Sequence, residues 1–461
     1  MRPTLHARRP FLRPRSAAAT AFTLLIGAAL VSPLGRTADE ADPRSVKWVC
    51  ANAPERVALL FDSLNLDRPA LAKVKQAVLA NDYPSACNAL IHYYRTAPTA
   101  KWLRHIRVEA TDKRSPRADA ILADDFEFIG ERATVPRAPG GGLDWSFAGP
   151  NGTPEWNWAF HCMDFLEPLM GSYFNTGRPE YAERIDRDIR DWILANPRPS
   201  HATCTGGWKG LETAMRVRSW LPVFYGMQMA DEFSPATRIL MLSSVLEHAQ
   251  YLMLFHRRDA NNWAVSEVSS LGAIGCAWPE FRDAGGWRAY SQEKIGWLVD
   301  ELVYPDGAEA ELTASYHRIA ADRLDDYVDT FRRFGYPVAD SIGVDVKRMW
   351  TYLAYTMRPD GTSPQTNDSD RGDNRERLLA AAKAYNRPDW SYIATNGREG
   401  NTPRIGPTVT FPWAGHTVMR SGWDANAQWS FFDAGPFGVA HQHHDKLHIS
   451  IDAFGRPLLV D

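Results

Sequence analysis

Near the end of the chain, residues 441–445 read His-Gln-His-His-Asp. Three histidines in four positions beside an aspartate are hard to explain as packing, because a His-x-His spacing on a strand or loop edge aims two imidazoles at one site. An imidazole changes charge near neutral pH, so it can transfer protons or bind a metal ion. The segment therefore predicts a catalytic or metal-binding role.

Two earlier segments carry polar groups that could act with these imidazoles. Residues 261–263 read Asn-Asn-Trp and lie between two apolar segments, although asparagine is equally typical of turns and helix N-caps. Residues 315–318 read Ser-Tyr-His-Arg and follow the acidic sequence Glu-Ala-Glu at 309–311. This second segment could also be the solvated first turn of a helix. Either segment by itself fits a functional site and an ordinary turn or helix start equally well.

An amide, a phenol and an imidazole are together the groups that β-elimination across the C4–C5 bond of a uronate requires. The C5 proton is weakly acidic, so hydrogen-bond donors must neutralise the neighbouring carboxylate as charge develops on it. A base then takes the proton, and an acid protonates the leaving oxygen at C4. Asparagine supplies neutral donors, while tyrosine and histidine supply the acid and the base.

The three segments resemble those of the heparinase II/III and alginate-lyase superfamily. The resemblance extends from about Trp156 to the end of the chain and includes two further segments, 208–216 and 454–461. It implies an α/α toroid followed by a C-terminal antiparallel β-sheet domain, with the active site in the cleft between them. It also implies a polysaccharide lyase whose substrate is an acidic polysaccharide or oligosaccharide, such as a heparin-like chain, alginate or a related uronate polymer.

By this resemblance, Asn262 neutralises the substrate carboxylate, Tyr316 is the base, the acid or both, and His441 is the second proton-transfer group. The family often has Asn-His where this chain has Asn-Trp at 262–263. That difference removes one histidine and leaves Asn261 as the alternative neutraliser. Guanidinium groups can bind carboxylates or sulfates through two hydrogen bonds. The predicted substrate-binding residues are Trp208, Glu212, Arg216, Asn261 and Arg318.

The resemblance also implies a structural zinc ion in the β-sheet domain. Its ligands in the family are the second histidine of the His-x-His motif, an aspartate at the end of the following hairpin, and a later histidine. These positions correspond to His443 and Asp461, and the third ligand is expected beyond the end of this chain. Since zinc prefers four ligands, the two present predict weak binding. No organic cofactor is implied.

Three other functions fit parts of the same sequence. The spacing of His441, His443 and Asp445 begins like a metallo-β-lactamase-type signature, but Lys446 replaces its last histidine. A glycoside hydrolase on a helical toroid could pair Asp306 with one of the glutamates at 309 and 311. A non-catalytic carbohydrate-binding protein could use the same scaffold, because a fold does not determine a function.

The elements that must position these groups are mostly helices. Between about 42 and 411, apolar residues recur at helical spacing, as at Ile185, Ile189, Trp192 and Ile193. A Ser-Pro pair at 234–235 predicts the start of another helix. Amphipathic helices joined by short turns, without alternating strands, indicate stacked helix pairs. Periodicity alone fits a closed toroid and an open solenoid equally well.

After about residue 411 the period changes to two. Residues 447–453 alternate apolar and polar side chains, 454–457 are typical of a turn, and 458–460 predict the next strand. We therefore expect a mainly α fold, with an α/α toroid at 41–375 and a linker and the beginning of an antiparallel β-sheet domain at 376–461. Strands should dominate after about 405. A sheet with an open edge at its last residue also indicates a truncated sequence.

Composition and charge limit the class of protein. The chain has 461 residues, of which 44% are hydrophobic, so it can bury a large core. Its formal net charge of −3 means that an acidic substrate must be held by a local basic patch, and no nucleic-acid partner is expected. The five cysteines are too few and dispersed for a disulfide scaffold. Oligomeric state is left open.

The first 40 residues are typical of a secretory signal peptide. Five arginines precede an apolar stretch from about 17 to 31, and a short polar run follows. No later stretch approaches 18 apolar residues, so we expect no membrane insertion. The protein is therefore expected to be periplasmic or secreted.

Overall fold

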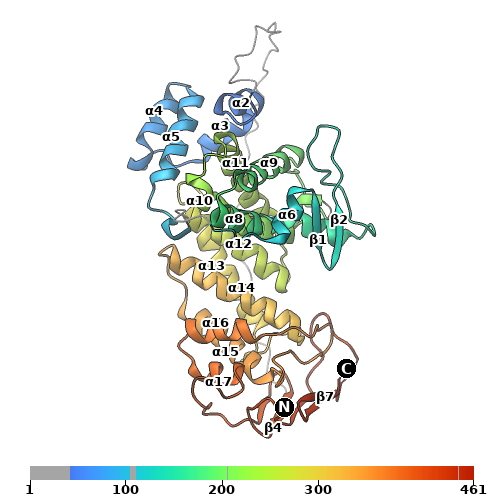
Figure 1. Cartoon of the computed structure of the whole chain (residues 1–461). Helices are drawn as coiled ribbons and strands as arrows, with labels where there is room; N and C mark the ends of the chain where they lie inside the picture. The colour runs from blue at the N-terminus through green and yellow to red at the C-terminus, as the bar shows by residue number, and fades with distance from the viewer. Residues whose placement is uncertain (1–41, 104–110, 205, 445, 461) are drawn as a thin grey trace.

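The computed structural model describes residues 42–103, 111–204, 206–444 and 446–460 (Figure 1). The signal peptide predicted at 1–40 lies outside these residues. Within them, no helix has both the length and the apolar composition that crossing a membrane requires. Helices form the greater part of the molecule, and a small antiparallel sheet lies at its C-terminal end (Figure 1).

The N-terminal part is a group of short helices that leads into the main helical body. Cys50 and Cys87, on two of these helices, have their sulfur atoms 4.0 Å apart. The helices, with the 3-10 turns Pro69–Leu71 and Lys101–Leu103, are α2 Val46–Asn52, α3 Pro54–Ser63, α4 Ala72–Leu79, α5 Tyr83–Thr96 and α6 Pro116–Leu122.

A two-stranded hairpin interrupts the helices where the sequence predicts almost wholly helical structure. Strand β1 (Asp125–Phe128) pairs antiparallel with β2 (Glu131–Thr134). The alternating sequence Asp-Phe-Glu-Phe has period two, which places both phenylalanines on the buried face. Ile129 and Gly130 make the turn with positive φ values of 49° and 77°. The strands are too short for this period to stand out in the sequence.

The main body consists of long helices joined by short connections. Two 3-10 turns, Gly206–Trp208 and Met227–Met229, lie before and after α10. The helices are α7 Pro154–Cys162, α8 Leu166–Thr176, α9 Pro179–Ala195, α10 Gly210–Gly226, α11 Pro235–Phe255, α12 Asn262–Ala277, α13 Ala284–Leu302, α14 Ala314–Arg333, α15 Asp340–Thr356, α16 Arg375–Ala384 and α17 Pro388–Ala394.

The predicted apolar stripes pack the core of this body. Ile185, Ile189, Trp192 and Ile193 of α9 are fully buried. At the start of α11, the Ser234 hydroxyl accepts a hydrogen bond from the backbone N–H three residues on, and a proline occupies the first helical position. These local signals, rather than the tertiary fold, determine where the helices begin.

The helices pack as two rows. Helix α10 contacts α7 and α12, and α12 contacts α14, so these four form one row; α9, α11, α13 and α15 pack behind them. Helices α10, α12 and α14 are each followed by one helix of the second row, α11, α13 and α15 respectively, whereas α7 is followed by α8, which packs against α9 (Figure 1). The row of α10, α12 and α14 therefore presents its N-termini at one end, as expected for an α/α toroid.

The C-terminal sheet has five antiparallel strands in sequence order. Val418, Trp429 and Phe431 form its small apolar cluster. The alternation at 447–453 is confirmed as strand β6, and a left-handed Phe454-Gly455 turn leads into β7. The strands are β3 Val409–Phe411, β4 His416–Arg420, β5 Trp429–Asp433, β6 Ile449–Ala453 and β7 Arg456–Leu459.

The predicted fold class, a mainly helical body followed by an antiparallel sheet, is confirmed. Both sheets among the described residues are antiparallel. The helices extend past the predicted boundary at 375, because α16 is rich in alanine, leucine, arginine and glutamate, which favour helix. A buried ion pair joins the two parts: Nε of Arg358, after α15, lies 3.1 Å from Oδ2 of Asp452 in β6.

Candidate active site

The first turns of α12 and α14 carry two of the predicted catalytic groups, Asn262 and Tyr316, beside the start of α10. Lys209, the N-cap of α10, has its Nζ 4.5 Å from the centre of the Trp263 ring in the first turn of α12. Asn262 of α12 in turn donates to Glu311, in the turn before α14. Since helix N-termini carry partial positive charge, this end of the body favours an anionic ligand.

Asn262 is buried, and Glu311 holds its amide in place. The Nδ2 atom lies 3.0 Å from Oε1 and 3.1 Å from Oε2 of the Glu311 carboxylate. A primary amide carries two N–H donors, so one carboxylate leaves a donor for a ligand. Gln442 donates to the backbone carbonyl of Glu311, which joins this group to the histidine segment.

Tyr316 and His441 meet face to face. Their ring centres are 3.8 Å apart and the planes are inclined by 16°. The backbone N–H of Tyr316 donates to the hydroxyl of Thr313, which caps α14. Burial, with a smaller contribution from Asp368, raises the pKa of the Tyr316 phenol. The hydroxyl is therefore protonated in the free protein at neutral pH.

One carboxylate holds two of the three histidines. Oδ2 of Asp368 lies 2.9 Å from Nδ1 of His441, and Oδ1 lies 2.8 Å from Nε2 of His443. These two hydrogen bonds, first that of His441, lower the pKa of Asp368. An ionised carboxylate only accepts hydrogen bonds, so Nδ1 of His441 and Nε2 of His443 each carry a hydrogen. The neutral His441 ring then keeps Nε2 as its proton-accepting atom.

His317, next to Tyr316, has a structural role. Its Nδ1 accepts from the backbone N–H of Glu309 at 3.2 Å, and its Nε2 lies 3.0 Å from the carbonyl of Met349. Burial lowers the pKa of His317 to about 4. Both nitrogens of a neutral ring are therefore used, and His317 is no substitute for His441 in proton transfer.

Asn261 is the N-cap of α12, and its role as a substrate ligand or alternative neutraliser stays a prediction. Its Oδ1 accepts from the backbone N–H of Ala264 at 2.9 Å, and its Nδ2 donates to Asp259 at 2.6 Å. The local role of asparagine at an N-cap accounts for both contacts. Asn262, one residue later, carries the amide that the site can use.

Arg216, for which substrate binding was predicted, has a fully buried side chain, and that role stays a prediction. Its Nε donates to Nε2 of His248 at 2.9 Å, and its Nη1 donates to the carbonyl of His161 at 2.9 Å. The guanidinium group lies 3.8 Å from the centre of the Trp192 ring. Arg216 therefore closes the core between α7, α9, α10 and α11.

Trp208 and Glu212 lie close to the site and are likewise buried, and their roles in substrate binding stay predictions. The indole of Trp208 donates to the carbonyl of Asn196 at 3.0 Å. Glu212 lies 3.7 Å from Nζ of Lys209, which itself is 3.2 Å from the centre of the Trp158 ring. Both residues thus support the first turn of α10. Arg318 is half-buried at the start of α14, and its role in substrate binding stays a prediction.

Glu267 supports the segment that carries Asn262. Its Oε2 accepts from the backbone N–H of Arg257 at 2.5 Å, and its Oε1 packs so closely on Gly210 that a Cβ there would meet it at 2.4 Å. Burial raises the pKa of Glu267 to about 7. The carboxyl is therefore protonated in the folded protein at a pH where it is ionised in the unfolded chain.

We expect Glu267→Gln to stabilise the protein at alkaline pH. A raised carboxyl pKa lowers the free energy of unfolding as pH rises from the unfolded value towards 7, by up to about 3 kcal/mol for this shift. The glutamine carbonyl still accepts from Arg257 but does not ionise. Urea unfolding of both proteins at about pH 5 and about pH 8 should show a larger gain at the higher pH. An equal difference at both pH values contradicts this.

Of the two zinc ligands predicted from the sequence, only His443 lies among the described residues, so the zinc site stays a prediction. His443 contacts Asp368, and Asp461 lies outside the described residues. In that part of the chain, no group of three or more histidine, cysteine, aspartate or glutamate side chains has the arrangement of a metal site. The donors present therefore do not make a complete site, and no catalytic step below depends on a metal.

Sequence reasoning missed the partners that hold the catalytic groups in place. In the sequence, Glu311 stood out only as a possible catalytic carboxylate of the alternative glycoside hydrolase. Its contact with Asn262 depends on the packing of α12 beside α14. Asp368 and Ser369 lie in a polar segment without a recognisable motif. Ser369 caps α14 by accepting from the backbone N–H of Ala314 at 2.8 Å. Only the tertiary structure brings this segment over the helix.

Known proteins of similar sequence are lyases. The chain is 27% identical to the heparin-sulfate lyase of Pedobacter heparinus over 422 residues, which are 87% of this chain and 62% of that lyase. It is 24% identical to the heparin-sulfate lyase of Bacteroides thetaiotaomicron over 400 residues, which are 79% of this chain and 56% of that protein. The chain thus spans about three fifths of the length of these relatives.

Solved structures agree with the fold. The crystal structure of a heparan sulfate lyase from Pedobacter heparinus superposes with a TM-score of 0.67 at 26% identity and covers 87% of this chain and 65% of its own. A crystal structure of heparinase III has a TM-score of 0.77 at 20% identity, which supports the fold alone. The family model described as Heparinase II/III N-terminus matches residues 60–388. On this match, the chain belongs to the heparinase II/III family.

Proposed function

We propose that this protein is a polysaccharide lyase that cleaves a uronate-containing acidic polysaccharide by β-elimination. The observation that carries the proposal is the Tyr316–His441 ring pair, 3.8 Å apart, beside the Asn262 amide held by Glu311. A proton donor, a proton acceptor and a carboxylate-binding amide are thereby held together by two distant parts of the chain. The relatives named heparin-sulfate lyases point to heparan-type chains as the first substrates to test.

The geometry supports a definite assignment of roles. The free amide N–H of Asn262 binds the substrate carboxylate and stabilises the negative charge that forms there. His441, whose Nδ1 is held by Asp368, takes the C5 proton on Nε2. The C5–H electron pair forms the C4–C5 double bond as the C4–O4 bond breaks. Tyr316 protonates the departing O4, so one proton is taken and one is given.

A glycoside hydrolase would need two carboxylates that reach the scissile bond. Glu309 and Glu311 are both almost fully buried, and burial raises the pKa of Glu309 well above its usual range. Asp306 accepts from the backbone N–H groups of Trp413 and Ala414 at 2.7 and 3.0 Å, which anchors the start of the sheet. Asp306 and Glu311 have structural partners, and the Glu309 carboxylate, for which the described residues supply no hydrogen-bond partner, is almost fully buried, so the lyase is favoured over the hydrolase.

The test is incubation with a panel of uronic-acid polymers, including heparan sulfate and alginate. A lyase produces an unsaturated uronate end with strong ultraviolet absorbance, together with new reducing ends. New reducing ends without that absorbance would identify a hydrolase instead. Binding without either product would identify a carbohydrate-binding protein. Mass spectrometry of the products distinguishes elimination from addition of water.

We further propose that the protein is exported and that zinc binds through His443 and Asp461 once a third ligand is supplied. Export is supported by the signal-peptide pattern at 1–40. Zinc is supported by the His-x-His motif, because neutral imidazole and carboxylate are typical zinc ligands. In a chain extended to supply the third ligand, zinc per chain, measured by mass spectrometry after metal reconstitution, should fall on His443→Ala; the 461-residue chain should bind zinc weakly with or without that substitution. Equal and stoichiometric zinc in both proteins would exclude His443 as a ligand.

A further inference from the structure

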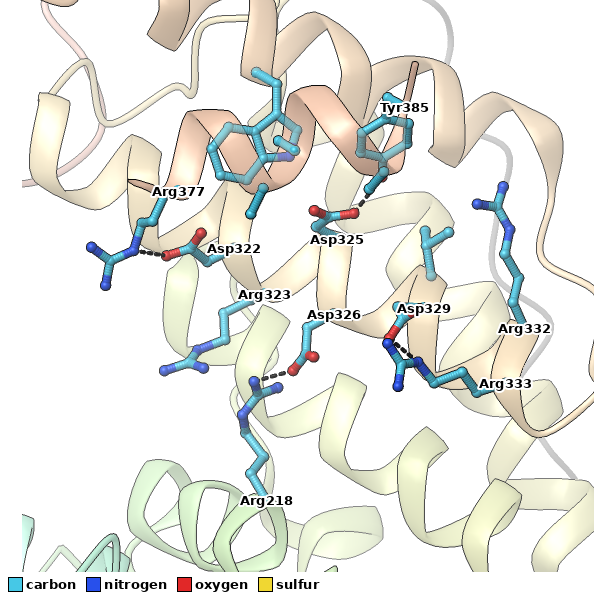
Figure 2. Close-up of a pocket in the computed structure, with 15 residues that line it drawn as sticks. Arg218, Asp322, Arg323, Asp325, Asp326, Asp329, Arg332, Arg333, Arg377 and Tyr385 are labelled. Carbon is cyan, nitrogen blue, oxygen red and sulfur yellow. Dashed lines mark hydrogen bonds and ion pairs between the residues drawn. The ribbon is translucent and has the colours of Figure 1, made fainter. Parts of the chain in front are cut away.

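A cavity of about 580 Å³ between α14 and α16 is lined by arginine and aspartate side chains (Figure 2). Arg218 of α10 forms an ion pair with Asp326 of α14. Nε of Arg377 in α16 lies 3.2 Å from Oδ2 of Asp322 in α14. Both aspartates also attract Arg323, which lies between them in the sequence of α14. The opposite charges therefore join three helices, and packing explains this cavity without a ligand.

Two cysteines of the N-terminal helices lie in direct contact. Cys50 is in α2 and Cys87 is in α5, and these two helices pack against each other. The sulfur atoms are 4.0 Å apart, although the residues are 37 positions apart in the chain. Cys87 is fully buried and Cys50 is partly exposed. An oxidant can therefore reach the pair through Cys50.

The two thiols differ in reactivity. A disulfide is attacked by a thiolate rather than by a thiol. The hydrogen bond with Cys87 lowers the pKa of the Cys50 thiol, whereas the same hydrogen bond, together with burial, raises the pKa of the Cys87 thiol. Cys50 is therefore the first thiol to attack, and Cys87 is the second.

We propose that Cys50 and Cys87 form a disulfide bond that links α2 to α5 in an oxidising compartment. The sulfur atoms of a disulfide are about 2 Å apart, so rotation of the two side chains and a small approach of the helices must close the remaining gap. The oxidant is another disulfide, either of a small thiol compound or of a protein. Secreted and periplasmic compartments are oxidising, and only in this respect does the proposal rest on the proposed export.

The bond forms by thiol–disulfide exchange. The Cys50 thiolate attacks one sulfur of the oxidant, whose disulfide bond breaks, and one thiolate leaves. Cys87 then loses its proton and attacks the Cys50 sulfur of this mixed disulfide, which releases the second thiolate. The two cysteines thereby lose two electrons and two protons, and the oxidant becomes two thiols.

The bond restrains a short helix at the edge of the helical body. Helix α2 has seven residues, too few to be stable as an isolated helix in water. Its packing against α5 and α11 therefore keeps it folded. A link between Cys50 and Cys87 closes a loop across 37 positions, which reduces the conformational freedom that α2 gains when it separates from α5. We expect slower local opening of α2 as the consequence.

The first experiment tests the bond itself. Reduced, folded protein is incubated with excess oxidised glutathione, its remaining thiols are alkylated, and it is digested with trypsin without reduction. Cleavage after lysine and arginine leaves Cys50 in peptide 48–56 and Cys87 in peptide 76–95. We expect one linked species in wild type and separate peptides in Cys50→Ser. Cys204→Ser is the matched control, because it removes an exposed thiol outside the pair and should keep the link. Separate peptides in wild type, alkylated or carrying glutathione, overturn the proposal.

The second experiment tests what the bond does. Hydrogen exchange of the backbone amides at 46–52 is measured by mass spectrometry for oxidised and reduced wild type. Exchange should be at least about tenfold slower in the oxidised protein, because the closed loop disfavours opening of α2. Cys204→Ser should show the same difference, and Cys87→Ser should show none. Equal exchange in oxidised and reduced wild type overturns the restraint of α2.

Expression of the full chain in a bacterial host separates the bond from export. Thiols are alkylated as the cells are opened, and the periplasmic and cytoplasmic fractions are digested as before. Linked peptides in the periplasmic fraction support the proposal, and separate peptides there overturn it. Protein found only in the cytoplasmic fraction contradicts the proposed export, and the glutathione experiment then decides the bond by itself.

Discussion

Tyr316→Phe is expected to lower kcat for polysaccharide cleavage by about 10²–10⁴-fold, the usual contribution of a positioned acid or base. The substitution removes only the hydroxyl, while the ring remains available to stack on His441. The cap of α14 uses the backbone N–H of residue 316 and does not depend on the phenol. The melting temperature should therefore stay close to that of wild type. Single-turnover formation of the unsaturated product measures the chemical step directly.

Tyr83→Phe is the matched control for this variant. Tyr83 lies in α5, at the opposite end of the molecule from the sheet, where its ring packs against Phe61 (Figure 1). Its variant should keep full activity. A folded Tyr316→Phe protein with activity close to wild type would transfer the acid role to another group. His317 is not that group, because both of its ring nitrogens are engaged within the protein.

The sequence predicts the helical elements well where a local signal is present. The stripe in α9 and the serine cap of α11 are such signals, because each depends on residues within a few positions of one another. The hairpin at 125–134 escaped prediction, since four-residue strands give too few alternations to compete with the surrounding helical pattern. Strands β3 and β4 were also not predicted individually within the β region; β3 has only three residues, too few to show an alternation.

The functional residues fall into two groups: those that a short sequence motif identifies, and those that only the tertiary structure brings to the site. Asn262, Tyr316 and His441 were found because they stand in short motifs that a resemblance can identify. Their partners were not found: Glu311 lies 49 positions from Asn262, and Asp368 lies 73 positions from His441. The burial of Arg216 could not be predicted, because the sequence does not distinguish an arginine in the core from one in a cleft. Burial is a tertiary property, and no local pattern near Arg216 indicates it.

Asn262→Ala is expected to lower kcat by about 10²–10³-fold, with a smaller effect on KM. The amide binds the substrate carboxylate weakly in the ground state and strongly as the enolate forms. Its removal therefore raises the free energy of the transition state more than that of the ground state. Removal of the amide also takes a donor from Glu311, which is buried. A loss of stability of about 1–3 kcal/mol should therefore accompany the loss of activity.

Asn261→Ala separates these two effects. Asn261 caps α12 through Ala264, so its replacement should cost about 1 kcal/mol of stability while kcat stays near wild type. Steady-state kinetics and thermal melting of the two variants, measured together, then distinguish a catalytic amide from a helix cap. If both variants lost stability but kept kcat, charge stabilisation would have to come from another donor. Equal loss of kcat in both would show instead that the start of α12, rather than the Asn262 amide, is what catalysis requires.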